Sequence, residues 1–208
     1  FFFKQKTAYE IYQCDWSSDV CSSDLLVKRE HLDDQGKKIF DDHTDPKGGT
    51  IRGLIGPGGI GLNSPQLAAL TRPVGRYLRF EAPESPRIRE TAILITAREC
   101  DSRFEWAAHE PEALSVGVPK KVVEVIKHKK PVTGLDKTDQ IIIKLGREAF
   151  GKRKVSPATF KAAHKRFGTK GLIDLVQLMG NYAGTAALLC VFDMQLDDGP
   201  EVCKLPVK

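Results

Sequence analysis

Apolar residues recur three or four positions apart along most of the chain after residue 64. That spacing places them on one face of an α-helix and is typical of helices that pack against a core. No stretch with the alternating pattern of a strand pairs with another such stretch, so we expect an all-α fold. The pattern predicts helices over 65–80, 86–99 and 102–116, then from 119, from 136, over 157–167 and over 172–192.

Three of these helices begin at a Ser-Pro pair, found at 64–65, 85–86 and 156–157. A serine side chain accepts a hydrogen bond from the free backbone N–H groups of a first helical turn, and proline there gives up no bond. Asp101 or Ser102 is expected to cap a further helix in the same way. Gly168 is expected to end the helix that starts at 157.

The domain organisation follows from these elements. We expect one helical domain over 64–196, a polar and then Gly-rich lead-in over 26–63 with room for one short helix, and a C-terminal tail over 197–208. The short helices leave much apolar surface for a chain of this size, notably on the last helix. Self-association covers such surface, so a homo-oligomer is expected.

The first 25 residues have a separate origin. Residues 4–11 (KQKTAYEI) and 14–25 (CDWSSDVCSSDL) resemble the conceptual translation of a sequencing-library adapter, with a variable gap between two constant blocks. We therefore expect residues 1–25 to be non-native and disordered, and we base no functional argument on them.

Composition narrows the classes of function. The net charge is +5, and the first 25 residues hold two lysines and four acids, so residues 26–208 carry +7. No apolar run reaches the roughly 20 residues that cross a bilayer, and the mean hydropathy is −0.29, so no membrane association is expected. Three scattered cysteines follow residue 25, without metal-type spacing, which favours a reducing, cytoplasmic location.

The strongest candidate for chemistry lies between residues 87 and 109. Glu105 and His109 are four residues apart, so on a helix they share a face and their side chains can meet. Glu90 lies on the preceding helix, which must turn back near Asp101 and can bring a second carboxylate to the same place. Two carboxylates around an imidazole are suited to general acid–base catalysis.

At this point the sequence resembles a known family. The Gly-Pro loop at 56–57, Asn63-Ser-Pro65, Arg89-Glu90, Glu105-Trp106 and His109 are similar to the carboxymuconolactone decarboxylase family. So are the later segments 167–168, 171–175 and 180–182, and the likeness covers about residues 53–196. The resemblance implies an all-α subunit of the alkyl hydroperoxidase D-like type that assembles as a homotrimer or homohexamer.

The resemblance also implies a reaction and a set of site residues. A small anionic lactone or related ring compound would lose CO₂, and His109 would supply the proton to carbon while Glu105 orients it and Glu90 tunes the transfer. No cofactor or metal is expected. The candidate substrate contacts are Arg89 and Arg98 for anionic groups, with Trp106, although large aromatic residues more often pack in cores, and Tyr182.

Two other functions stay open. Alkyl hydroperoxidase D-like peroxidases use a Cys-x-x-Cys pair ahead of the histidine, and this chain has Ser102 and Glu105 at those positions, which disfavours peroxide reduction. A catalytically silent oligomeric binding protein is the second alternative. The basic clusters at 127–130 and 152–154 are expected to be solvated surface, so no nucleic acid is expected as a partner. The glycines of 56–61 spell G-x-G-x-x-G, but no βαβ unit surrounds them, so a turn-rich loop is expected.

Overall fold

The computed structural model describes residues 26–45, 53–194 and 205–206. All regular elements in these residues are helical, which confirms the all-α class. The predicted non-native segment and nearly all of the predicted tail lie outside the described residues. The helices are η2 (Arg29–His31), α2 (Asp34–Thr44), α3 (Pro57–Gly61), α4 (Pro65–Arg76), η3 (Tyr77–Glu81), α5 (Pro86–Glu99), α6 (Arg103–Ser115), α7 (Lys120–Lys127), α8 (Lys137–Gly146), η4 (Arg147–Gly151) and α9 (Pro157–Val191).

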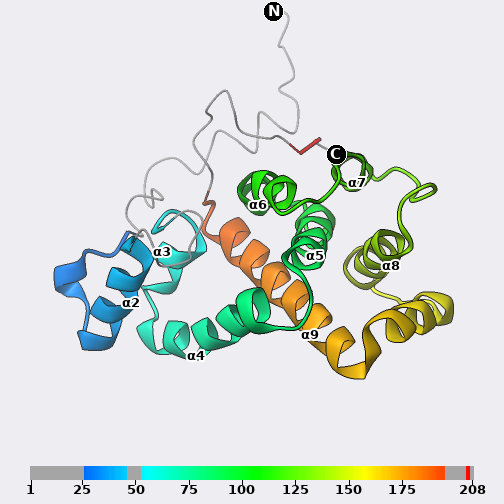
Figure 1. Ribbon diagram of the computed structural model, residues 1–208. Helices are drawn as coiled ribbons and strands as arrows, with labels where there is room; N and C mark the ends of the chain where they lie inside the picture. The colour runs from blue at the N-terminus through cyan, green and yellow to red at the C-terminus, as the bar shows by residue number, and fades with distance from the viewer. Residues whose placement is uncertain (1–25, 46–52, 195–204, 207–208) are drawn as a thin grey trace, which may run out of the picture.

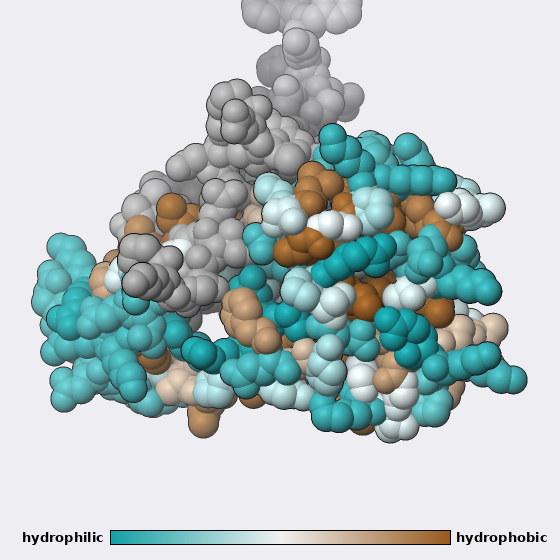
Figure 2. All heavy atoms as spheres, viewed as in Figure 1, coloured by the Kyte–Doolittle hydropathy of each residue, from teal (hydrophilic) through white to brown (hydrophobic). Residues whose placement is uncertain are grey.

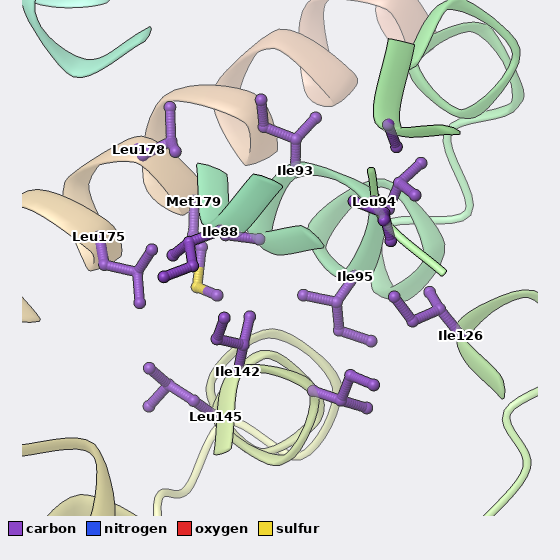
Figure 3. Close-up of a cluster of buried hydrophobic side chains, with 14 of the residues drawn as sticks. Ile88, Ile93, Leu94, Ile95, Ile126, Ile142, Leu145, Leu175, Leu178 and Met179 are labelled. Atoms are coloured by element: carbon purple, nitrogen blue, oxygen red, sulfur yellow. The ribbon is translucent and has the colours of Figure 1, made fainter. Parts of the chain in front are cut away.

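Helix α5 forms the axis of the core, and α6, α7, α8 and α9 pack around it (Figure 1). All of its residues from Ile88 to Arg98 are buried, as befits a helix covered on every side. Its isoleucine and leucine side chains meet Ile126 of α7, Ile142 of α8 and Met179 of α9 (Figure 3). Full burial of each such side chain contributes about 1.5–3 kcal/mol, so this cluster dominates the stability of the fold.

The helix starts agree with the capping residues predicted from the sequence, with one exception. The side chains of Ser85, Ser102 and Ser156 each accept a hydrogen bond from a backbone N–H of the first turn of α5, α6 and α9. Asp136 caps α8 in the same way. Ser64 has no side-chain cap hydrogen bond in the described structure, so α4 starts at its proline without that contribution.

Gly168 breaks α9 where the sequence predicted a helix end. Its φ of 67° and ψ of 178° are non-helical, and a left-handed φ of this kind is accessible to glycine at little cost. The part of α9 after Gly168 packs against α5 and α8, with Leu172, Leu175 and Met179 in the main core.

By length and composition, α9 is the one helix in the described part of the chain that could cross a membrane. Its most apolar window of 18 residues still contains polar side chains and so is not an unbroken apolar run, and the expectation of no membrane association stays a prediction. Of that window, 39% is buried inside the protein. An apolar helix that supplies the core of a globular fold meets the same criterion.

The lead-in contains more helix than the single short one expected. Helices α2 and α3 both form, and Leu32 and Ile39 pack with Leu62 and Ala68 in a second, smaller apolar cluster. The predicted turn-rich loop at 56–61 is in fact the helix α3 with Gly56 at its start. Gly56 has φ 99°, which other residues rarely adopt, and a Cβ there would meet the ring of Phe104, so glycine favours this close approach of the lead-in to α6.

The apolar stripe predicted on the first helix does lie on one face, but most of it faces solvent. Leu67, Leu70 and Val74 are 57%, 74% and 53% exposed, whereas Leu78 is buried. Hydrophobic atoms are visible at the lower edge of the molecule over α4, next to the hydrophilic surface over α2 (Figure 2). This apolar face of α4 remains uncovered in the single chain.

Candidate functional site

The three residues of the predicted acid–base group meet in the structure. His109 Nδ1 lies 2.7 Å from Glu90 Oε2, and His109 Nε2 lies 3.5 Å from Glu105 Oε2. All three side chains are more than nine-tenths buried. The short Nδ1 contact assigns the Nδ1 proton to a hydrogen bond with Glu90, which leaves Nε2 directed at Glu105.

The turn between α5 and α6 brings the three groups together. Cys100 ends α5, Asp101 adopts a left-handed φ of 50°, and Ser102 caps α6. This sharp reversal packs α6 back along α5, so Glu90, one helix earlier, reaches the face of α6 that carries His109. Glu105 follows from the helical repeat, because residues four apart share a face.

A cavity of about 190 Å³ opens beside this group. Residues of the lead-in, of η3, of α6 and of α9 line this cavity. The lead-in contributes His43, Gly53, Ile55, Pro57 and Gly58; the π-helical turn η3 contributes Arg79; α6 contributes Phe104, Glu105, Ala108 and His109; and α9 contributes Asn181, Tyr182 and Thr185. His109 and Glu105 line this cavity. Glu90 contacts His109 but is not among the lining residues.

The positions of the two carboxylates reverse the roles expected from the sequence. Glu105 was expected to orient His109, and Glu90 to tune the proton transfer. In the structure Glu90 makes the short contact that fixes the ring, while Glu105 lies beside Nε2 and lines the cavity together with His109. The spacing of Glu105 and His109 could not reveal this, because the approach of Glu90 depends on how α5 and α6 pack.

Burial governs the electrostatics of the cavity wall. Loss of water raises the pKa of Glu105, opposed by the nearby charges of His109 and Arg79, so its carboxyl holds a proton more readily than usual. Burial also raises the pKa of Tyr182, whose hydroxyl therefore stays protonated. The ring of Tyr182 meets His109 edge-on, with centroids 5.0 Å apart.

Replacing Glu105 with glutamine is expected to raise the melting temperature by a few degrees at about pH 8 and to change it little at about pH 4. Because its pKa is raised on folding, Glu105 contributes stability that is complete below the ordinary glutamate pKa and is lost as the pH rises through the folded-state value. Glutamine does not titrate, so the variant escapes that loss. Thermal unfolding followed by circular dichroism measures the difference.

The control for this experiment is Glu124→Gln. Glu124 also faces a histidine four residues later, at 3.3 Å, but both side chains are exposed, so its replacement is expected to shift the melting temperature little at either pH. Equal, small shifts for both variants at both pH values would contradict the raised pKa of Glu105.

Arg89 and Arg98, predicted to hold the anionic groups of a substrate, are not among the residues that line this cavity. The guanidinium of Arg89 donates to the backbone oxygens of Ala82 and Glu84. Arg98 donates to the backbone oxygen of Lys127 and pairs with Asp101. Both arginines satisfy the backbone of the fold, and the substrate role assigned to them does not fit their positions.

Trp106, the third predicted substrate contact, also lies away from the cavity. It is 0% exposed, and its indole N–H donates to Glu110 Oε2 at 2.8 Å. One position along a helix turns a side chain by about 100°, so Trp106 faces the core while Glu105 faces the cavity. Tyr182, the fourth candidate, does line the cavity.

Two titratable residues of the cavity, Arg79 and His43, were assigned no role by the sequence analysis. Burial and the neighbouring charge of Arg72 lower the pKa of His43, so it favours the neutral form. The one available signal for Arg79 is its place in a π-helical turn, a distortion frequent at functional sites, but that turn is not visible in the apolar spacing.

At the two positions where the peroxidases carry cysteine, this chain has Ser102 and Glu105. Ser102 is the cap of α6, and Glu105 belongs to the group around His109. Cys100 is half-buried, and burial raises its pKa, which is the opposite of what a nucleophilic thiolate needs.

The basic cluster at 127–130 is paired with acidic side chains. Glu110 lies near Lys127, Glu99 near Lys129, and Glu124 near both His128 and Lys130, each within 4 Å. Such pairing is typical of a mixed-charge surface.

Comparisons with models of protein families, with curated proteins and with solved structures find no match to this chain. The fold and the site together define an all-helical protein with a buried Glu-His-Glu group at the wall of a small cavity.

Proposed function

We propose that this chain is an acid–base enzyme of the carboxymuconolactone decarboxylase type, acting on a small anionic lactone or related ring compound. The observation that carries the proposal is the buried Glu90–His109–Glu105 group, whose His109 and Glu105 line the cavity. Buried titratable groups of this kind cost stability, and they concentrate at functional sites.

The size of the cavity supports a ligand with one ring. A dry cavity of roughly 150 Å³ in another protein accepts benzene. The cavity beside His109 measures about 190 Å³, enough for one ring with small substituents. Its walls combine apolar side chains with a few polar groups, the usual composition of a small-molecule site.

The proton-transfer step follows from the arrangement. Glu90 holds Nδ1, so Nε2 is the nitrogen that exchanges a proton with Glu105 or with a ligand. The raised pKa of Glu105 makes it a proton reserve next to Nε2. The bond between the ring and its carboxylate breaks to release CO₂, the electron pair moves through the conjugated ring to the carbonyl oxygen, and a proton from Nε2 adds to carbon. Water then returns a proton to the site.

The proposed assembly is a homotrimer or homohexamer in the cytoplasm. It is supported by the uncovered apolar face of α4, formed by Leu67, Leu70 and Val74, and by exposed Ile173 and Val191 on α9. Contact between copies of this chain would bury these side chains. Light scattering, which measures the mass of the assembly, distinguishes the two states.

The direct test is a turnover assay with 4-carboxymuconolactone in D₂O. The expected result is release of CO₂ together with one deuterium on carbon of the product, since the proton comes from a group that exchanges with solvent. Binding without CO₂ release would instead favour the silent binding protein. Turnover of a peroxide with a dithiol reductant would favour the peroxidase.

A further inference from the structure

Arg98 is buried although it carries a charge and does not line the cavity. Its side chain is 6% exposed, its Nε donates to the backbone oxygen of Lys127 at 2.8 Å, and its guanidinium pairs with Asp101. A charge is costly to bury unless hydrogen bonds replace its contacts with water. Lys127 ends α7 and Asp101 comes just after α5, so Arg98 binds the chain where two helices end.

The backbone of the turn after α5 has the hydrogen bonds of a Schellman motif. The N–H of Asp101 donates to the oxygen of Arg98 at 3.3 Å, and the N–H of the next residue, Ser102, donates to the oxygen of Ala97 at 2.9 Å. This motif needs a left-handed residue, usually glycine, and here Asp101 takes that place with a φ of 50°. Aspartate is tolerated there better than most residues, and unlike glycine it gives Arg98 a carboxylate to bind.

No flexible linker separates α5 from α6. Ser102, which closes the Schellman motif, is also the cap of α6, because its Oγ accepts a hydrogen bond from the backbone N–H of Glu105 at 3.4 Å. The chain therefore passes from the end of one helix directly into the start of the next. Hydrogen bonds have preferred directions, whereas apolar contacts are non-directional, so the turn and its hydrogen bonds fix the angle between the two helices.

A second contact connects Arg98 to the middle of α6. Lys127 ends α7, so its backbone oxygen has no partner within that helix, and Arg98 supplies one. The Nζ of Lys127 lies 3.4 Å from Glu110 Oε1, and Glu110 directly follows His109 on α6. Arg98 thus holds the start of α6 through Asp101 and its middle through Lys127.

The distance of His109 from the turn magnifies any change in the angle between α5 and α6. His109 lies eight residues after Asp101, which corresponds to about 12 Å along a helix. A tilt of about 5° would therefore move His109 by about 1 Å. The contact of its Nδ1 with Glu90 measures 2.7 Å, and a separation of about 3.6 Å is already too long for a hydrogen bond. This contact therefore depends on a rigid turn.

We propose that Arg98 is a positioning residue that fixes the angle between α5 and α6 by binding Asp101 and the backbone oxygen of Lys127. The fixed angle keeps Glu90 in hydrogen-bond contact with His109. Arg98 is not among the residues that line the cavity, so it acts through the turn. The effect of Arg98 on turnover rests on the proposed function, whereas its effect on the contact between Glu90 and His109 does not, so the two effects are measured separately.

The test follows the Nδ1 proton of His109, which the hydrogen bond with Glu90 protects from exchange with water. Nitrogen-15 NMR of protein with labelled histidines detects this proton and its exchange rate, and the signal is assigned by its loss in His109→Gln. Arg98→Met keeps the length of the side chain and removes every donor. Asp101→Asn keeps the tolerance for a left-handed φ and removes the charge that Arg98 binds.

Arg98→Met is expected to speed exchange of the Nδ1 proton by about 10-fold or more, because a charge-assisted hydrogen bond is weakened. The kcat for 4-carboxymuconolactone should fall by about 10- to 100-fold, since a displacement of about 1 Å can cost about 100-fold in rate. The KM should change little, because Arg98 does not line the cavity. Asp101→Asn should change the exchange rate and kcat by about 3- to 10-fold, and the double variant should be no worse than Arg98→Met alone.

A conservative variant shows whether the directed hydrogen bonds of Arg98 are required. Arg98→Lys keeps the charge but offers a single ammonium group, which cannot replace a planar guanidinium at two fixed acceptors. It is expected to recover part of the slow exchange and part of kcat relative to Arg98→Met.

The matched control is Arg147→Met. Arg147 is also partly buried, and its guanidinium donates to the backbone oxygens of Val125 and Lys130, near the end of the same helix α7. Neither acceptor belongs to the turn between α5 and α6. Arg147→Met is therefore expected to lower the melting temperature, as Arg98→Met does, while the exchange rate of the Nδ1 proton and kcat stay native.

The proposal would be overturned by a folded Arg98→Met with native exchange and native kcat, by equal changes in Arg147→Met, or by a native protein whose His109 Nδ1 proton is not protected. If Arg98→Met does not fold, Asp101→Asn, at the more exposed end of the pair, decides by the same criteria. Faster exchange in a protein that releases no CO₂ would support the positioning role of Arg98 and refute decarboxylation alone.

Discussion

His109→Gln is expected to lower kcat for decarboxylation by about 10²- to 10⁴-fold, the usual contribution of a positioned acid or base. Glutamine keeps much of the volume and can still hydrogen-bond to Glu90, but it cannot carry a proton between Glu105 and the ligand. The affinity for a stable lactone, 5-oxotetrahydrofuran-2-carboxylate, should change much less than kcat, since most of the residues that line the cavity lie outside α6. Initial rates of CO₂ release and calorimetry measure the two quantities.

The structure offers a closely matched control for this variant. His128 also follows a glutamate by four residues, at 3.3 Å, yet the pair is exposed and outside the cavity. His128→Gln is expected to retain native kcat. Full activity of His109→Gln, with an intact fold by circular dichroism, would rule out His109 as the proton donor.

The acid–base group could be predicted because it depends on local rules. Glu105 and His109 are joined by one helical turn, and a sharp reversal near Asp101 follows from the caps and the short connection. Capping chemistry likewise predicted the starts of α5, α6 and α9 and the break at Gly168. Each of these features depends on residues that lie within a few positions of it in the sequence.

The remaining features depend on tertiary packing. The direction of α4 turns Leu67 and Leu70 to solvent and places Arg79 at the cavity, and neither result follows from apolar spacing. His43 reaches the cavity because the lead-in packs against α4 and α9 and comes close to α6 where Gly56 meets Phe104. Arg89 and Arg98 were named because a guanidinium suits an anionic group, but the fold brings backbone carbonyls to both of them, and Arg98 also pairs with Asp101.

Trp106 was named as a candidate substrate contact, although large aromatic residues more often pack in cores. In the structure it is fully buried among the apolar residues around α5, with its N–H held by Glu110 and with Lys127 Nζ 5.9 Å from the ring centroid. Its contribution is therefore to the free energy of unfolding, and ligand affinity should be insensitive to it as long as the fold persists.

Trp106→Ala is expected to lower the free energy of unfolding by about 3–5 kcal/mol, because it leaves a large cavity and removes the donor to Glu110. That loss can be most of the stability of a domain, so Trp106→Phe, which preserves most of the volume, is measured beside it; we expect a loss of about 1–3 kcal/mol. Urea unfolding gives both values. Phe160→Ala, at an exposed aromatic residue, should cost under about 0.5 kcal/mol. Native stability of Trp106→Phe together with much weaker binding of 5-oxotetrahydrofuran-2-carboxylate would show that Trp106 contacts the ligand, because a core residue affects ligand binding only through the fold.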